Sequence, residues 1–204
     1  MISTEGPSDS VLASLAATGD ERAFATLVHR HKEPLYRLLR RYTGNADEAY
    51  EAAHEAFIAA WAALGRYDPK QPFLAWLRTI AINKARDRGR RTAFRRLLFG
   101  AQSFDESGAL SKPDTAVSAD EVMIGRQDMA ILDLAIAKLP AALKEALLLT
   151  VFDGWSQQEA GDILGVSAKT IETRAYRARK ILARTLDPTV KPTVWRRRLR
   201  ERKR

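Results

Sequence analysis

The sequence predicts an all-α protein made of two small helical domains joined by a linker. Apolar residues recur at helical spacing in two blocks, over about residues 21–91 and 121–186, and no segment alternates apolar and polar residues as a half-buried strand does. Residues 92–120, between the blocks, are rich in Gly, Ser, Asp and Pro. We therefore expect a first domain over 1–91, a flexible linker over 92–120, a second domain over 121–187 and a basic tail over 188–204.

Composition limits the classes of protein to which the chain can belong. Of its 204 residues 46% are hydrophobic, and no apolar run reaches the roughly 18 residues that a membrane span needs. The chain has no cysteine, which excludes disulfides and thiolate zinc sites and fits a cytoplasmic location. Because residues 191–204 carry +7 of the net charge of +9, nucleic-acid binding by the body of the protein must be argued from local patterns.

The first block predicts three helices and one loop. Pro34 suits the first position of a helix, where the missing amide hydrogen costs nothing, and the apolar face that follows ends at Thr43-Gly44. An Ala-rich helix is expected over 46–64. Residues 65–72 have the composition of a turn, and the helical period then resumes from Phe73 to about Arg88.

Aromatic and basic residues alternate between Tyr67 and Arg91. Single-stranded nucleic acid binds where bases stack on rings while cations follow the phosphates, so this segment is a candidate surface for a single strand. The alternative is that Phe73 and Trp76, three residues apart on one helix, both belong to the core.

The expected helix over 46–64 is acidic, with like charges four residues apart. Such pairs destabilise a helix slightly, so this face is either well solvated or meets a basic partner. Two patterns on it come close to enzyme motifs. Glu51-Ala52-Ala53-His54 matches one Glu-x-x-His unit of a di-metal site, but such sites need a second unit, which the sequence lacks. In the zinc-protease motif that His54-Glu55 begins, Ile58 stands where the second His is needed. We therefore expect no enzyme, no catalytic residue, no cofactor and no metal.

The second block contains the pattern of a helix-turn-helix. Ser156 and Glu159 form a capping box at the start of one helix, and Ser167 can cap the next. Gly165 lies between them, where the chain must turn, and Gly161 is a small residue where two helices cross closely.

The helix after this turn has one apolar face, formed by Ile171, Ala175, Ala178 and Leu182. Its opposite side carries Thr and Arg near the N-terminus, which suits phosphates and base edges in a major groove. The alternatives are a solvated basic face and a helix at a membrane surface. The turn before the helix disfavours the first, and the small apolar stripe disfavours the second.

Both blocks resemble the sigma factors of bacterial RNA polymerase, in particular the short extracytoplasmic-function type, over about residues 20–186. The most specific segments are EAFIAAW (55–61) and PFLAWLRTIAINKARD (72–87) in the first block, which looks like domain 2, and residues 139–182, which look like domain 4. The resemblance implies that domain 2 docks on the clamp helices of the largest polymerase subunit and captures the melted non-template strand of the −10 element. It implies that domain 4 reads the −35 element as duplex and meets the polymerase flap. The resemblance also implies an anti-sigma factor as a partner.

The resemblance assigns roles to individual residues by position. The polymerase contact falls on Glu51, His54, Glu55 and Phe57. The −10 region falls on Tyr67, Trp76, Asn83 and Arg86. The −35 helix uses Lys169, Thr170, Glu172, Thr173, Arg174 and Arg177.

The sequence departs from the family pattern at three places. Ala52, Ala53 and His54 replace a usual Leu, Val and Gln in the polymerase contact, and Ala160-Gly161 replaces a usual Ile-Ala in the first helix of the helix-turn-helix. Glu172 stands where many members have Lys or Arg. A carboxylate can accept a hydrogen bond from the amino group of cytosine, so our hypothesis is that Glu172 tunes promoter choice.

Two other functions stay open. One is a free-standing helix-turn-helix regulator, which the acidic helix and the strand-capture segment disfavour. The other is a sigma mimic that sequesters an anti-sigma factor, which the presence of Arg174 and Arg177 disfavours. The basic tail is either a solvated end or a source of sequence-independent affinity for phosphates, and we favour the second.

Overall fold

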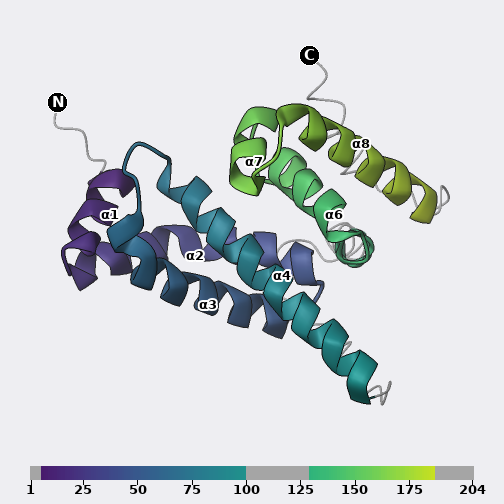
Figure 1. Cartoon of the computed structure of the whole chain (residues 1–204), viewed down its shortest axis with the longest axis horizontal. Coiled ribbons are helices and arrows are strands. Elements are labelled where there is room, and N and C mark those ends of the chain that lie inside the picture. The colour runs from purple at the N-terminus through teal and green to yellow at the C-terminus, as the bar shows by residue number, and fades with distance from the viewer. Residues whose placement is uncertain (1–5, 100–128, 187–204) are drawn as a thin grey trace, which may run out of the picture.

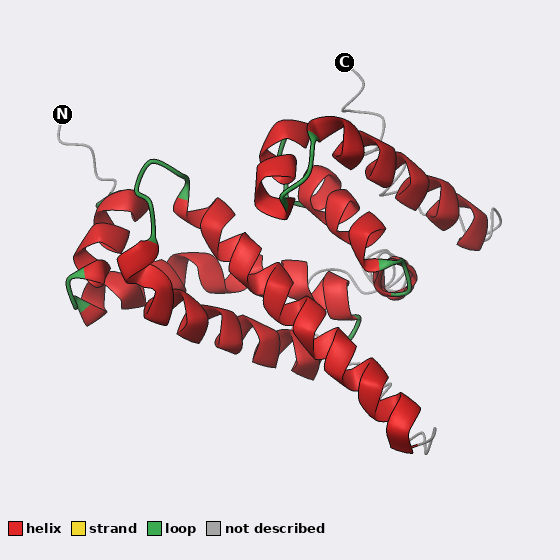
Figure 2. Cartoon of the chain, viewed as in Figure 1, coloured by secondary structure: helices red, strands yellow, loops and turns green. Residues whose placement is uncertain are grey.

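The computed structural model describes residues 6–99 and 129–186, and these ranges contain helices and turns but no strand (Figures 1 and 2). Within them the expected all-α architecture of two helical domains is confirmed. No helix of the described ranges is long and apolar enough to cross a membrane. The predicted tail and most of the predicted linker lie outside these ranges.

Four α-helices and a short 3-10 turn make up the first domain. They are α1 (Asp9–Ala17), α2 (Glu21–Thr43), α3 (Ala46–Ala63), η1 (Leu64–Arg66) and α4 (Phe73–Phe99). Helices α2, α3 and α4 pack on one another, and α1 packs on α2. Helix α1 was not among the predicted helices. Ser8 caps it, and Asp9 ties it to α2 through Arg30 (2.9 Å) and His31 (2.7 Å).

Helix α2 corrects the predicted start at Pro34, because the helix begins at Glu21 and runs through the proline to Thr43. A proline inside a helix removes one backbone hydrogen bond. Here the buried stripe is continuous across that position, from Leu27 through His31 and Leu35 to Tyr42. Burial of this stripe outweighs the lost hydrogen bond. The predicted end is confirmed, since Gly44 adopts a left-handed conformation (φ 76°) after Thr43.

Small residues let α3 lie close to its neighbours. Its buried face consists of alanines and Phe57, which confirms the Ala-rich helix expected over 46–64. Helix α4 continues to Phe99, past the expected domain boundary at residue 91, and in Figure 1 its far end projects beyond the bundle.

The second domain starts, within the described residues, with a helix over residues 129–137. It continues through α6 (Ala141–Leu147), a π-helical turn η2 (Leu148–Phe152), α7 (Gln157–Leu164) and α8 (Ala168–Thr185). The chain turns between these helices at Leu139-Pro140, at Asp153-Gly154 and at Gly165, and the turn at Gly165 is as predicted. Helix α8 packs on α6 and α7, and a single apolar core joins these helices.

The two domains are in contact. Helix α4 packs on α7, and α2 packs on η2, so the second domain lies along one side of α4 (Figure 1). Lys144 of α6 donates to the backbone carbonyls of Tyr42 (2.8 Å) and of Ala137 (2.6 Å). Arg41 donates to Asp133 (3.2 Å) and lies over the ring of Phe152. The contact between the domains is therefore rich in charged groups.

Candidate nucleic-acid interface

Backbone capping fixes where both helices of the helix-turn-helix begin. The Ser156 hydroxyl accepts a hydrogen bond from the backbone amide of Glu159 (3.2 Å), and the Glu159 carboxylate accepts one from the backbone amide of Ser156 (2.8 Å). These two hydrogen bonds confirm the capping box. These hydrogen bonds to Ser156 lower the pKa of the Glu159 carboxyl. The Ser167 hydroxyl accepts a hydrogen bond from the backbone amide of Thr170 (3.2 Å) and caps α8 as expected.

Two glycines determine how α8 leaves the turn. Gly165 ends α7 in the left-handed region (φ 68°), as predicted. Gly161 lies so close to the turn that a Cβ atom there would be 2.6 Å from the carbonyl oxygen of Val166. The amide of Val166 also donates to the carbonyl of Gly161 (2.9 Å), so the close approach is held by a hydrogen bond. A small residue is required at this crossing.

Helix α8 buries one face and exposes the other. Ile171, Ala175, Ala178 and Leu182 are all buried, which confirms the predicted apolar face. The predicted DNA residues lie on the solvent side. A shallow hollow of about 260 Å³ brings five of them together with Ser167, namely Lys169, Thr170, Thr173, Arg174 and Arg177.

Glu172 lies outside this hollow and is paired along the helix. Its carboxylate accepts a hydrogen bond from Lys169 at 2.7 Å, with both side chains exposed. Tyr176, one turn further on, is 62% exposed and was not singled out in the sequence. Its exposure could have been expected, because it lies opposite the Ile171–Leu182 face.

The aromatic residues of the first domain form one cluster. The rings of Tyr67, Phe73 and Trp76 lie within 5.7 Å of one another, centre to centre. Phe73 and Tyr67 are buried, Trp76 is half-buried, and the Tyr67 hydroxyl donates to the carbonyl of Gln71 (2.7 Å). The core role that we considered for Phe73 is confirmed. Tyr67 also packs in the core, and Trp76 is the ring of this cluster that reaches solvent.

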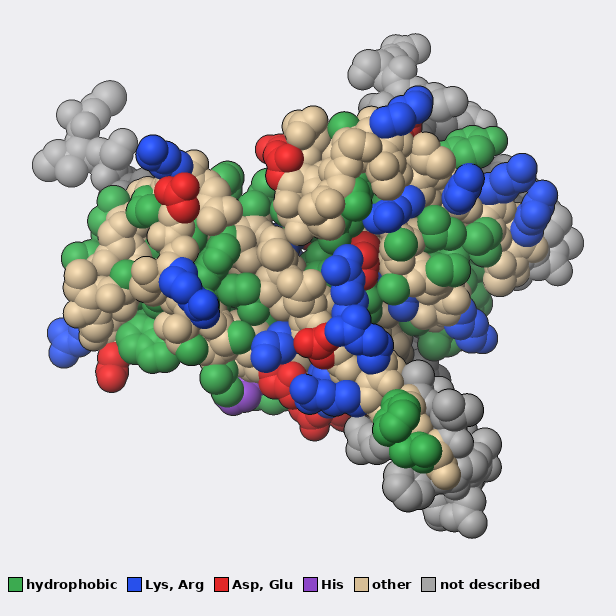
Figure 3. All heavy atoms as spheres, in the orientation of Figure 1, with side chains coloured by type: hydrophobic (Ala, Val, Ile, Leu, Met, Phe, Trp, Pro, Cys, Tyr) green, Lys and Arg blue, Asp and Glu red, His purple; other side chains and the backbone are tan. Residues whose placement is uncertain are grey.

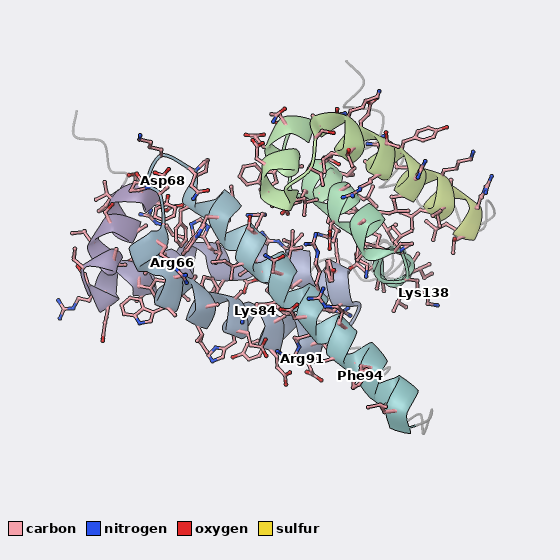
Figure 4. The ribbon with its side chains drawn as sticks, viewed as in Figure 1. Arg66, Asp68, Lys84, Arg91, Phe94 and Lys138 are labelled. Carbon is pink, nitrogen blue, oxygen red and sulfur yellow. The ribbon has the colours of Figure 1, made fainter. Side chains whose placement is uncertain are left out.

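Basic side chains follow α4 past this cluster. Asn83 is exposed and accepts a hydrogen bond from Arg86 (3.2 Å). Lys84 and Arg91 lie further along the same helix, and Phe94 near its end (Figure 4). Arg86 also reaches the second domain, where Nε donates to Glu145 at 2.6 Å and Nη2 makes a second hydrogen bond to the same carboxylate. The hydrogen bond to Glu145 raises the pKa of Arg86.

The acidic face of α3 finds a basic partner inside the chain. Arg88 of α4 donates to Glu55 (2.6 Å) and to Glu51, so two of the like charges share one guanidinium. Burial lowers the pKa of Arg88, but the hydrogen bonds that Arg88 donates to both carboxylates raise it more. Red and blue side chains gather in Figure 3 where α3 meets α4.

A row of exposed side chains runs beside this acidic face of α3. Tyr50 is 70% exposed and Ile58 57% exposed, with His54 between them and Trp61 at the end of the row. Phe57, which the resemblance assigned to the polymerase contact, is buried in the core. Among the described residues, no three His, Asp or Glu side chains converge as metal ligands.

The comparisons with known proteins agree with this geometry. The family model "Sigma-70 region 2" matches residues 27–108, and the model "Sigma-70, region 4" matches residues 129–182. These matches define the class as transcription-initiation proteins of the sigma-70 type. The chain belongs to the RNA polymerase sigma factors, in the extracytoplasmic-function branch. Sigma factors are not a class of enzymes.

Several relatives match over nearly their whole length. RNA polymerase sigma factor CnrH of Cupriavidus metallidurans is 35% identical over 182 residues, which are 88% of this chain and 94% of CnrH. RNA polymerase sigma-H factor of Pseudomonas aeruginosa is 32% identical, over 90% of this chain and 96% of that protein.

Two solved structures also resemble the chain. CnrH in complex with the cytosolic domain of CnrY superposes with a TM-score of 0.64 at 34% identity, over 88% of this chain and 97% of CnrH. The sigma factor RpoE in complex with the anti-sigma factor NepR, from Bartonella quintana, also gives a TM-score of 0.64, at 26% identity, over 80% of this chain and 98% of that one.

Proposed function

We propose that this chain binds core RNA polymerase and directs transcription initiation by recognising the −10 and −35 elements of its promoters. The observation that carries the proposal is the exposed Thr- and Arg-lined face of α8, held by a capped helix-turn-helix next to a domain with an arginine-rich helix. The protein acts in the cytoplasm and supplies no catalytic group of its own.

The −35 element is read as duplex by α8. Arg174 and Arg177 approach phosphates or guanine edges from the hollow, and Thr170 and Thr173 lie between them. Lys169 lines the hollow as well, but its hydrogen bond to Glu172 neutralises part of its charge. The Glu172 carboxylate can therefore accept a hydrogen bond from the amino group of a base, and it holds the Lys169 ammonium through their ion pair. Through these two interactions Glu172 tunes promoter choice.

The −10 strand follows α4. Trp76 offers the partly exposed ring, Asn83 an amide, and Arg86 a cation, while the half-buried Lys84 and the exposed Arg91 continue the positive charge along the helix. Stacking on rings and tracking of phosphates together give the affinity for a single strand. Tyr67 contributes by packing under Trp76, with ring centres 5.1 Å apart.

Core polymerase docks on the solvent side of α3. The exposed row of Tyr50, His54 and Ile58 supplies apolar contact area, and Glu51 and Glu55 border it. Phe57 supports this surface from the core. An anti-sigma factor is a further partner of the chain, because CnrH and RpoE, which it resembles, were both solved as complexes, RpoE with a named anti-sigma factor.

Run-off transcription with purified core polymerase tests the proposal. We expect transcripts from a cognate promoter only when the chain and the core are both present. Arg174→Ala combined with Arg177→Ala should abolish dependence on the −35 element, whereas Arg179→Ala, an exposed arginine on the other flank of α8, is the matched control and should not. If the chain does not co-purify with core polymerase and still binds duplex DNA specifically, a free-standing regulator replaces this proposal.

A further inference from the structure

A single carboxylate fastens α1 to α2. Asp9, the first residue of α1, accepts a hydrogen bond from Arg30 at Oδ1 (2.9 Å), and its Oδ2 lies 2.7 Å from Nε2 of His31. Arg30 also donates to the backbone carbonyl of Pro7 (2.8 Å), so the chain just before α1 is held as well. Both oxygens of Asp9 are therefore engaged, which restricts rotation of the carboxylate.

His31 lies in the core with its polar edge fixed by this carboxylate. It is 8% exposed, and its ring centre lies 5.6 Å from that of Phe73, the first residue of α4. A buried polar side chain costs free energy unless it is hydrogen-bonded, and a satisfied one favours a single arrangement of the core. The interaction with Asp9 therefore sets the orientation of the ring that packs against Phe73.

Ring contacts continue from His31 to the partly exposed Trp76. Phe73 packs on Tyr67 and on Trp76, with ring centres 5.7 Å apart in both pairs, and Tyr67 packs on Trp76 at 5.1 Å. Helix α1 also packs on η1 and on α4, the two elements that this cluster joins. The orientation of the Trp76 ring therefore depends on the buried rings behind it.

The charge of Asp9 also acts on the hydroxyl of Tyr67. Burial raises the pKa of Tyr67, and the nearby carboxylates of Asp9 and Asp68 raise it further. The hydroxyl therefore stays protonated and donates to the carbonyl of Gln71 (2.7 Å), which holds the loop between η1 and α4 in place. Asp9 thus supports the ring cluster from a second direction.

Attachment of α1 to the bundle does not itself require these polar contacts. The helix buries Leu12, Ala13 and Ala16, and this apolar face already packs on the rest of the domain. The side chains of Arg30 and Asp9 remain about one third exposed, and such ion pairs contribute little to stability. What the contact between Asp9 and His31 adds is a fixed orientation of the histidine ring.

We propose that Asp9 and His31 are positioning residues for capture of the −10 strand. Asp9 fixes His31, and His31 together with Phe73 forms the buried support that keeps the Trp76 ring turned for a base to stack on its solvent side. Helix α1 is thereby part of the strand-binding site. This inference rests on the proposed function, because it concerns the ring that the −10 strand would use.

Three charge-matched variants test the positioning role. Asp9→Ala removes both interactions of the carboxylate, whereas Asp9→Asn keeps hydrogen-bonding atoms at the same two positions. The matched control is Asp20→Ala, which removes the cap of α2, where Asp20 accepts the backbone amides of Arg22 (2.9 Å) and Ala23 (3.0 Å). Each variant loses one negative charge from the first domain, so the general electrostatic attraction of DNA changes in the same direction in all three.

The readout is the affinity for a fluorescein-labelled single strand of the holoenzyme, which is the chain bound to core RNA polymerase. The strand carries the non-template −10 sequence of a promoter found by mapping start sites, and core polymerase alone is the blank. We expect Asp9→Ala to bind this strand about five- to tenfold more weakly than Asp20→Ala does, because stacking on one ring is impaired. Asp9→Asn should bind as Asp20→Ala does, and all three should bind the −35 duplex equally. Equal strand affinities of Asp9→Ala and Asp20→Ala would overturn the inference.

A double-mutant cycle shows whether Asp9 acts through Trp76. Two residues that act through the same contact have non-additive effects. We expect Asp9→Ala to weaken strand binding in the wild-type background and to change it little in a Trp76→Ala background, where the remaining affinity comes from the cations of α4. Equal weakening in both backgrounds would contradict the inference. If Asp9→Ala does not fold, His31→Leu, which fills the space of the histidine without its hydrogen bond, takes its place in both experiments.

Run-off transcription separates failure of this inference from failure of the proposed function. If the wild-type chain with core polymerase gives promoter-specific transcripts and the variants bind the strand alike, only the positioning role is wrong. If the wild-type chain with core polymerase gives no transcript from any promoter, the proposed function itself fails.

Discussion

Replacing Gly161 by alanine tests the geometry of the helix-turn-helix most sharply. The new Cβ atom would lie 2.6 Å from the carbonyl oxygen of Val166, 3.4 Å from the amide nitrogen of Ala168 and 3.5 Å from the carbonyl carbon of Ser167. All three are backbone atoms, so no side-chain rotation relieves the contact. The turn itself must move, and the hydrogen bond between Val166 and Gly161 opposes that movement.

The expected magnitude follows from three terms. Overpacking costs about 1–3 kcal/mol, and weakening the hydrogen bond costs about 1 kcal/mol more. The higher helix propensity of alanine returns about 1 kcal/mol. We therefore expect Gly161→Ala to lower the free energy of unfolding by about 1–3 kcal/mol. Because α8 begins directly after this turn, its affinity for −35 duplex should fall as well.

Gly89→Ala is the matched control. Gly89 lies inside α4, is exposed, and a Cβ atom there would meet nothing within 4 Å. Only the propensity term remains, so this variant should be more stable by up to about 1 kcal/mol. Urea unfolding followed by circular dichroism measures both variants. The reasoning is refuted if Gly161→Ala is as stable as the wild type or if both variants change in the same direction.

Four further variants test the cap of α8, the buried Lys144, the acidic face of α3 and the role of Glu172. Ser167→Ala removes the cap of α8 and should cost about 1 kcal/mol, measured as a lower urea midpoint. Burial lowers the pKa of Lys144 from 10.5 to about 8, so between these pH values the unfolded state binds more protons than the folded state. The free energy of unfolding should therefore rise by about 2 kcal/mol between about pH 7.5 and 9.5. Lys144→Met should abolish that rise in urea unfolding measured across this pH range. Arg88→Ala leaves Glu51 and Glu55 without their basic partner, but solvent screens this mostly exposed acidic face. The free energy of unfolding should therefore fall by less than about 1 kcal/mol, and a larger loss would contradict the expected screening. Glu172→Lys should reorder the affinities of α8 for different −35 duplexes in a binding competition, and equal tightening on all of them would refute its role in promoter choice.

The parts of the fold that local chemistry determines could be predicted from the sequence. The capping box at Ser156, the left-handed Gly165 and the buried stripe from Ile171 to Leu182 each depend on residues within a few positions of one another. Pro34 misled for the same reason. Its local preference marks a helix start, but burial of the stripe on both sides of it, which is a tertiary effect, keeps α2 continuous.

Contacts between distant segments could not be predicted. Arg86 and Glu145 are 59 positions apart, and nothing in either segment names the other as its partner. The like charges on α3 indicated a basic partner without saying which one, and Arg88, 33 positions from Glu55, provides it. Likewise, the resemblance did not separate the buried Phe57 and Tyr67 from the more exposed residues assigned with them.

Mapping the 5′ ends of transcripts made in vitro shows whether this chain directs core RNA polymerase to particular promoters. Core RNA polymerase would transcribe fragmented genomic DNA with and without the chain, and the start sites would be compared. We expect a set of start sites that appears only with the chain and lies downstream of two shared sequence elements. Arg174→Ala and Arg177→Ala together should remove the dependence on the upstream element. Start sites that are the same with and without the chain would contradict it.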